Sequence, residues 1–278
     1  MPTTMKPRGW RKVAIASWPK PHDPTTYGIL ELDASAALRY LDSLTERTGR
    51  SVTMLSLVLK ALAHAMAQEP ASTRMLRFGR WVERDSLDLF VQVDRAGRDL
   101  SGIKLVNVPA KPLLDVAREL SERAAGVRAE KSRESLRRST SVTDLLPMAL
   151  LPLAVRIQDF LAHDLGLSIP PLGIFPDPFG AAMVTNIGSL GLDLALPPVP
   201  PIARSSLVMA MGRVSEKPWV VEGQVVVRPV VRFGVAVDHR YLDGAQASRI
   251  AQAFTAVLRD PEALFGPDGR GLGETQDA

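Results

Sequence analysis

A strand, a polar turn and a helix follow one another near the end of this 278-residue chain, and this series constrains the fold most. The run 225–237 is apolar and rich in β-branched residues, which is typical of a strand. Residues 245–258 carry apolar side chains at helical spacing, which predicts an amphipathic helix. Between them, residues 238–244 read Asp-His-Arg-Tyr-Leu-Asp-Gly. Few folds need so polar a turn for stability, so we interpret His239 as a functional residue.

A second block, residues 183–191, lies upstream and reads Met-Val-Thr-Asn-Ile-Gly-Ser-Leu-Gly. Residues 238–245, Asp-His-Arg-x-x-Asp-Gly-Ala, resemble the signature of the catalytic domain of 2-oxo acid dehydrogenase dihydrolipoamide acyltransferases. The upstream block is similar to the same family's hydroxyl-Asn-(Ile/Leu)-Gly-x-x-Gly. Thr185 and His239 lie 54 positions apart, which is close to the spacing in the family. Two blocks in the right order and at this separation indicate the resemblance more strongly than either block alone.

The resemblance implies an α/β fold of the chloramphenicol acetyltransferase type. This is a two-layer sandwich with a mixed sheet flanked by helices, and it is homotrimeric. We expect residues 1–278 to form a single acyltransferase catalytic domain, standing alone without a lipoyl domain. We also expect a basic N-terminal arm at 1–12, an insertion atypical of the family at 135–178, and a flexible polar tail at 266–278.

The amino-acid composition excludes several kinds of functional site. The chain has no cysteine, which removes disulfides, thiolate metal sites and a cysteine nucleophile. Its four histidines lack ligand spacing, so we predict no metal. The net charge of +4 comes without a dense Lys/Arg cluster, so nucleic acid is not implied, although a basic rim would suit an anionic ligand such as coenzyme A.

Hydropathy gives no prediction of a membrane span. The first residues lack the apolar core of a signal peptide. The most apolar run, 145–155, has eleven residues, whereas about 20 are needed to cross a bilayer. We therefore expect a cytoplasmic protein.

Periodicity and breaker residues predict the other elements. In order, they are a strand at 27–32, a helix capped by Asp33 or Ser35 and ended by Gly49, a helix at 51–68, a hairpin from 76–82 and 86–94, a strand at 100–108, a helix at 112–134, and strands at 179–184 and 207–214. Within 135–178, Ile157, Phe160, Leu161 and Leu165 recur at helical spacing. Two interpretations of that segment stay open: a helical lid or packing element, and an interface for another subunit or partner.

The reaction implied by the resemblance moves an acyl group between the sulfur of dihydrolipoamide and the sulfur of coenzyme A. A free thiol has a pKa of about 8.5, so at neutral pH a base must take its proton. A neutral imidazole can do so, and we assign this role of general base to His239. We assign Thr185, which stands where the family usually has Ser, to donate a hydrogen bond to the oxyanion that forms on the thioester carbonyl.

The remaining site residues are expected to support these two. Asp243 should hold the histidine turn by hydrogen bonds and by a salt bridge to Lys20 or Arg240. Gly244 is expected to adopt a backbone conformation that other residues resist. Asn186 and Gly188 belong to the upstream block, where the glycine lets the loop approach closely.

In the family, the histidine of one subunit faces the hydroxyl residue of the next, so a homotrimer is the smallest active unit that the resemblance implies. We expect a separate protein to supply the lipoyl group. The polar ending favours an isolated trimer over a larger cage. Two alternatives remain: a trimeric scaffold with the same fold that has lost its substrate, and an acyltransferase acting on a small-molecule hydroxyl.

Overall fold

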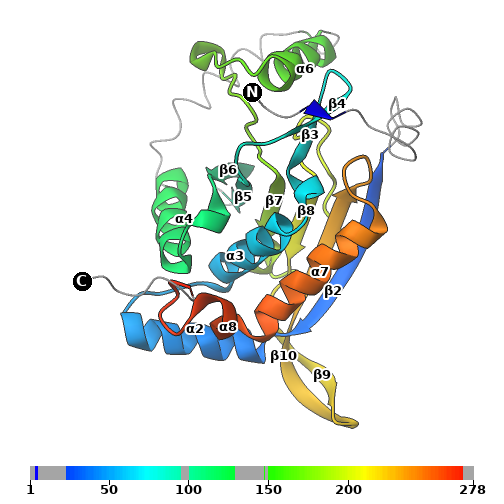
Figure 1. Cartoon of the computed structure of the whole chain (residues 1–278). Helices are drawn as coiled ribbons and strands as arrows, with labels where there is room; N and C mark the ends of the chain where they lie inside the picture. The colour runs from blue at the N-terminus through cyan, green and yellow to red at the C-terminus, as the bar shows by residue number, and fades with distance from the viewer. Residues whose placement is uncertain (1–3, 6–22, 95–99, 129–146, 148–149, 272–278) are drawn as a thin grey trace.

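The computed structural model describes residues 4–5, 23–94, 100–128, 147 and 150–271 (Figure 1). Within these residues, seven strands form a mixed sheet in the order β2-β10-β8-β7-β5-β6, with β9 paired to the first half of β10. The strands are β2 (Thr25–Asp33), β5 (Leu89–Asp94), β6 (Leu100–Leu105), β7 (Ala182–Asn186), β8 (Leu207–Met211), β9 (Ser215–Val221) and β10 (Gln224–Asp238). The pairs β5–β7 and β7–β8 are parallel and the others are antiparallel.

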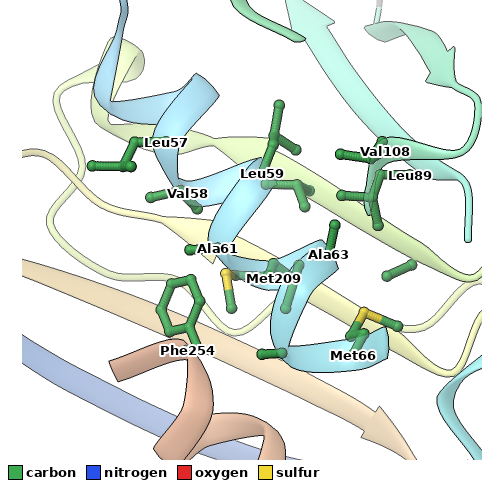
Figure 2. Close-up of a cluster of buried hydrophobic side chains, with 14 of the residues drawn as sticks. Leu57, Val58, Leu59, Ala61, Ala63, Met66, Leu89, Val108, Met209 and Phe254 are labelled. Atoms are coloured by element: carbon green, nitrogen blue, oxygen red, sulfur yellow. The ribbon is translucent and has the colours of Figure 1, made fainter. Parts of the chain in front are cut away.

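Helices cover one face of this sheet. They are α2 (Ser35–Thr48), α3 (Met54–Ala67), α4 (Leu113–Arg128), α7 (Gly244–Arg259) and α8 (Pro261–Phe265). The central one is α3, whose side chains are apolar on nearly all sides and mostly buried. Figure 2 shows Leu59, Ala61 and Met66 of α3 in one cluster with Met209 of β8 and Phe254 of α7. The prediction of a mixed sheet flanked by helices is confirmed.

The opposite face of the sheet carries a smaller apolar cluster that includes Met183, Val208 and Ala236. The loop 191–203 crosses this face so closely that glycine is required beneath it. A Cβ atom at Gly234 would lie 1.9 Å from the carbonyl oxygen of Ala195. Because side chains alternate along β7, Val184 faces the helices whereas Met183 and Thr185 face the loop.

Most predicted elements are present with small shifts at their ends. Gly49 ends α2 in the left-handed conformation, as predicted. The N-cap of α2 is Ala34, and Asp33 accepts a hydrogen bond from the backbone N–H of Ser35 without acting as the cap. The hairpin β9–β10 turns at Glu222 and Gly223, both with positive φ.

The predicted hairpin between 76–82 and 86–94 is wrong. The hairpin is instead β3 (Arg74–Arg77) with β4 (Arg80–Glu83), joined by Phe78 and Gly79, which both have positive φ. β1 (Thr4–Met5) adds to its far side, and β5 joins the main sheet between β6 and β7. A two-residue turn ending in glycine matches the twist of paired strands, which explains the tighter hairpin.

The segment 150–178 is partly helical and leaves several apolar side chains exposed. It contains α6 (Leu151–Asp159), a wide helical turn over Phe160–Asp164 and a short helix over Pro170–Leu172. Three of the residues at helical spacing, Ile157, Phe160 and Leu165, are 44–50% exposed, and the described residues that are buried in this segment are Ala162, His163 and Ile174. Residues 135–146 and 148–149 lie outside the described residues.

The two ends of the chain are described only in part. Of the segment predicted as a flexible tail, residues 266–271 are hydrogen-bonded to the body. The Tyr40 hydroxyl donates to the Gly266 carbonyl at 2.9 Å, and the Leu113 N–H donates to the Gly269 carbonyl at 3.0 Å. Most of the arm at 1–12, and residues 272–278, lie outside the described part. Among the described helices, none is long and apolar enough to cross a bilayer.

Candidate active site

His239 immediately follows β10, in a turn that backbone hydrogen bonds hold in place. Its N–H donates to the Pro24 carbonyl at 2.9 Å, just before β2 begins. The N–H groups of Tyr241 and Leu242 both donate to the Asp238 carbonyl, at 3.0 and 3.1 Å. The histidine backbone is therefore fixed between the ends of two paired strands.

Asp238 and Arg240 form a buried ion pair inside this turn. The Asp238 carboxylate is 1% exposed, and it accepts from the Arg240 backbone N–H at 2.9 Å and from the guanidinium at 2.6 Å. Desolvation acts to lower the pKa of Arg240, but the hydrogen bonds and charge of Asp238 outweigh it and raise that pKa. The pair keeps both charges and braces the residues on either side of His239.

Tyr241 ties the same turn to the β3–β4 hairpin. Its hydroxyl oxygen accepts from the Leu76 N–H at 3.3 Å, and its side chain is fully buried. Burial, and then the negative charge of Asp238, raise the pKa of this phenol, so it stays neutral at physiological pH.

Asp243 begins α7 as its N-cap. Its carboxylate accepts from the Gln246 N–H at 2.9 Å, and the Gln246 side chain accepts from the Asp243 N–H at 3.0 Å, which makes a capping box. Of its two expected cationic partners, Arg240 pairs with Asp238, and Lys20 lies outside the described residues.

The structural reason predicted for Gly244 is wrong. Its φ lies outside the left-handed region, and a Cβ atom built there would meet nothing within 4 Å. Gly244 instead lines a cavity beside His239, where a small residue leaves open space.

Glu69 lies just after α3, is buried, and contacts the first turns of α7. It accepts from the Gln246 side chain at 3.1 Å and from the Arg249 guanidinium at 2.5 Å. Since its partners lie about 180 positions away, no local sequence pattern indicates this role.

Thr185 lies within β7 rather than in the loop after it. Its side chain is partly exposed, and its hydroxyl makes no hydrogen bond to another described residue. Asn186 caps the following short helix, with its side-chain oxygen accepting from the Ser189 N–H at 3.3 Å. A Cβ atom at Gly188 would lie 2.7 Å from the backbone of Arg213, so this glycine permits a close contact within the chain.

One copy of the chain does not bring Thr185 and His239 together. Thr185 is in register with Ala210 of β8, which is in register with Gly234 of β10. His239 follows Gly234 by five residues, which corresponds to roughly 16 Å along the sheet, and two strand spacings add about 10 Å across it. The two residues therefore lie at opposite ends of the strands.

An apolar cavity of about 170 Å³ opens beside His239, between β2 and α7. Nδ1 of His239 is buried. Among the described residues, no group of three His, Asp or Glu side chains is placed to hold a metal ion. The geometry suits proton transfer at a fixed imidazole next to an apolar space.

Residues 180–266 match a family model described as 2-oxoacid dehydrogenases acyltransferase (catalytic domain). A dihydrolipoyllysine-residue acetyltransferase component of a pyruvate dehydrogenase complex from Acholeplasma laidlawii is 31% identical over 88 residues, which is 31% of this chain and 15% of that protein. A lipoamide acyltransferase component of a branched-chain alpha-keto acid dehydrogenase complex from Pseudomonas putida is 34% identical over 84 residues, or 30% of this chain and 19% of that protein. The chain thus matches less than a fifth of the length of these two relatives.

Solved structures show the fold over the whole chain. A probable dihydrolipoamide acetyltransferase from Listeria monocytogenes aligns with 99% of this chain and 97% of its own, at 20% identity and a TM-score of 0.62. A chloramphenicol acetyltransferase aligns with 93% of this chain and all of its own, at 13% identity and a TM-score of 0.54. Residues 180–266, which carry both Thr185 and His239, thus match the model of the 2-oxoacid dehydrogenases acyltransferase (catalytic domain) family, within a chain of chloramphenicol acetyltransferase-like fold.

Proposed function

We propose that this protein is a coenzyme A-dependent acyltransferase that moves an acyl group between dihydrolipoamide and coenzyme A. The observation that carries the proposal is the fixed position of His239 beside an apolar cavity, within residues that match the family model. Coenzyme A and dihydrolipoamide are the two thiol substrates. No step of this proposal uses a metal ion.

His239 serves as the general base. In the direction toward acyl-coenzyme A, Nε2 takes the proton from the coenzyme A thiol, and the sulfur attacks the thioester carbonyl of acyl-dihydrolipoamide. The tetrahedral oxyanion then collapses, the bond to the lipoyl sulfur breaks, and the leaving thiolate recovers the proton from the imidazolium. A positioned base of this kind contributes roughly 10²–10⁴-fold to the rate.

Thr185 donates its hydroxyl hydrogen bond to the oxyanion. Its hydroxyl is free of partners among the described residues, which leaves it able to do so. Since Thr185 and His239 lie at opposite ends of the strands of one copy, the site requires two copies of the chain. A closed homotrimer supplies this arrangement at every subunit contact.

A solved structure with the same fold supports the roles of these positions. It comes from an investigation of one serine, one histidine and one asparagine in the catalytic mechanism of an Azotobacter vinelandii dihydrolipoamide acetyltransferase. There the asparagine follows the histidine by four positions and the serine precedes it by 52. Asp243 follows His239 by four positions here, and Thr185 precedes it by 54. The hydroxyl is kept, while a carboxylate replaces the amide.

Thiol release from acyl-coenzyme A in the presence of dihydrolipoamide tests the proposal. We expect His239→Ala to lower kcat by at least about 100-fold and Thr185→Ala by roughly 10²-fold, because each removes a group that acts in the transition state. His64→Ala is the matched control, because His64 lies in α3 and bonds the Gln68 side chain.

The outcomes separate the alternatives. Equal rates in the wild type and in His239→Ala, or no transfer in either, would refute the proposed activity and favour a scaffold. Transfer to a small hydroxyl compound but not to dihydrolipoamide would show that the acyl acceptor is a hydroxyl group and not the lipoyl thiol. Light scattering that shows a stable, active monomer would refute the shared site.

A further inference from the structure

The cavity beside His239 is almost wholly apolar. Apart from Thr26, Tyr27, His239 and Asp243, every described residue that lines it is apolar or glycine, and none of these described residues is Lys or Arg. Its floor includes Leu62 of α3 and Phe254 of α7, both fully buried. The space therefore offers hydrocarbon contacts, with polar groups confined to a few positions near the histidine.

Small residues on both walls create this space. Gly28 of β2 pairs with Val235, whose side chain faces the helices, so a side chain at Gly28 would point the same way. A Cβ atom built at Gly28 would meet nothing within 4 Å. Across from it, α7 presents Gly244, Ala247 and Ala251 at successive turns, until the large ring of Phe254 closes the row.

We propose that this cavity binds the hydrocarbon tail of the acyl group, with the thioester carbonyl at His239, and that it selects straight or branched chains of about four to six carbons. This inference rests on the proposed transfer and specifies its substrate class. An engineered cavity of about 150 Å³ lined by Leu, Ile and Phe takes up benzene, with six carbons, so about 170 Å³ accommodates a chain of this size.

The same lining disfavours two other acyl groups. An acetyl group has no methylene to place in the cavity and leaves it empty. A succinyl group would bury its terminal carboxylate where none of the lining residues in the described part of the chain is Lys or Arg, which is costly. Relatives at 31–34% identity are named for acetyl, succinyl and branched-chain complexes, so similarity alone does not choose among these groups.

The test compares acetyl-, butyryl-, hexanoyl- and succinyl-coenzyme A as donors to dihydrolipoamide. Each buried methylene is worth about fourfold, so we expect kcat/KM for butyryl to exceed that for acetyl by about 15-fold. Ala251→Leu fills the cavity from the helix side and should lower the hexanoyl-to-acetyl ratio at least tenfold. Gly28→Val fills it from the strand side and should act in the same direction if Ala251→Leu folds poorly.

Ala256→Leu is the matched control, since Ala256 is exposed on the same helix and does not line the cavity. It should keep the wild-type chain-length profile. A wild type that prefers acetyl or succinyl, or an unchanged profile in both cavity variants, would overturn the inference while the proposed transfer stands.

Equilibrium binding separates the two proposals if the wild type transfers no acyl group. Titration calorimetry would then compare hexanoyl-coenzyme A with coenzyme A itself. Tighter binding of the hexanoyl form in the wild type and in Ala256→Leu, but not in Ala251→Leu, supports the apolar site without the transfer. Equal affinity of both compounds for the wild type overturns the site as well.

Discussion

The turn that carries His239 and the segment 150–178 each contain an aspartate that pairs with an arginine, but the two regions differ in what holds them in place. In the turn, Arg240 pairs with Asp238, two positions away, and the flanking β10 and α7 belong to the main apolar core. Asp159 and Asp164 of the segment pair with Arg204, which lies outside it, 45 and 40 positions away. The first region is fixed by a local ion pair, by hydrogen bonds to neighbouring strands and by the core, whereas a few long-range charged contacts fix the second.

Figure 1 shows the same contrast in space, because α6 lies at the end of the molecule opposite the β9–β10 hairpin and outside the sheet-helix body. Phe78 and Phe160 meet edge to face with centroids 5.9 Å apart, but Phe160 remains 44% exposed. A region with so little buried apolar surface depends on each of its ion pairs. We therefore expect one substitution to release it without unfolding the core.

Arg204→Met should give the largest effect. Removing the guanidinium takes away the cation that Asp159 and Asp164 share, so these largely buried carboxylates keep only His163 and the Phe78 N–H as partners, which costs about 3 kcal/mol. Hydrogen exchange should show amides of 150–164 losing protection while those of β10 keep it. Arg213→Met is the control, since the Arg213–Asp193 pair is largely exposed and solvent screens its attraction. Equal losses for the two arginines would contradict the comparison.

Asp238→Asn tests the other region. It keeps the shape but removes the charge that pairs with Arg240, and we expect a loss of about 2 kcal/mol in unfolding free energy. kcat should fall about tenfold, because positioning errors near the reacting atoms are costly. Urea denaturation and acyl-transfer kinetics measure both. Unchanged kcat with lowered stability would show that the pair does not position His239.

Acid should release the segment 150–178 before it unfolds the core. Burial acts to raise the pKa of Asp159 and of Asp164, but hydrogen bonds from His163 and Arg204 to the first, and from Arg204 and the Phe78 N–H to the second, hold both below the ordinary value of 3.8. Their stabilisation is present above about pH 4 and is lost as the pH falls through the lowered values. Exchange protection of 150–164 that is unchanged down to pH 3 would contradict this.

Asp243→Ala should have the smallest effect, about 1 kcal/mol, because it removes an N-cap. Asp243→Asn keeps the capping oxygen and should recover most of that stability in thermal denaturation. A loss as large as that of the alanine variant would show that the carboxylate charge, and not the cap, stabilises α7.

Local patterns were sufficient to predict the core of this fold. The β-branched run into His239 and the apolar spacing of Ile250, Phe254 and Val257 predicted β10 and α7, because each pattern reports burial of one face. In and just after α6, the helical spacing of Ile157 and Phe160 does not report a buried face, since both side chains are 44–50% exposed. What places that helix is Arg204, and no periodicity reports a contact 45 positions away.

The candidate site likewise contains residues that the sequence predicted and features that it did not. The motifs named His239, Asp243 and Thr185, and the capping box is visible in the order Asp-x-x-Gln. The Pro24 carbonyl, Glu69 and the cavity were not predictable, because each depends on which strands and helices pair. Gly244 shows the limit of a motif, since the glycine was found but its structural reason was not.

The distance between Thr185 and His239 within one copy has a consequence for mixtures of inactive variants. If each site in a three-membered ring takes its imidazole from one copy and its hydroxyl from the next, Thr185→Ala and His239→Ala chains mixed at random rebuild an intact pair at about one site in four. Two preparations that are nearly inactive apart would then complement each other after mixed refolding.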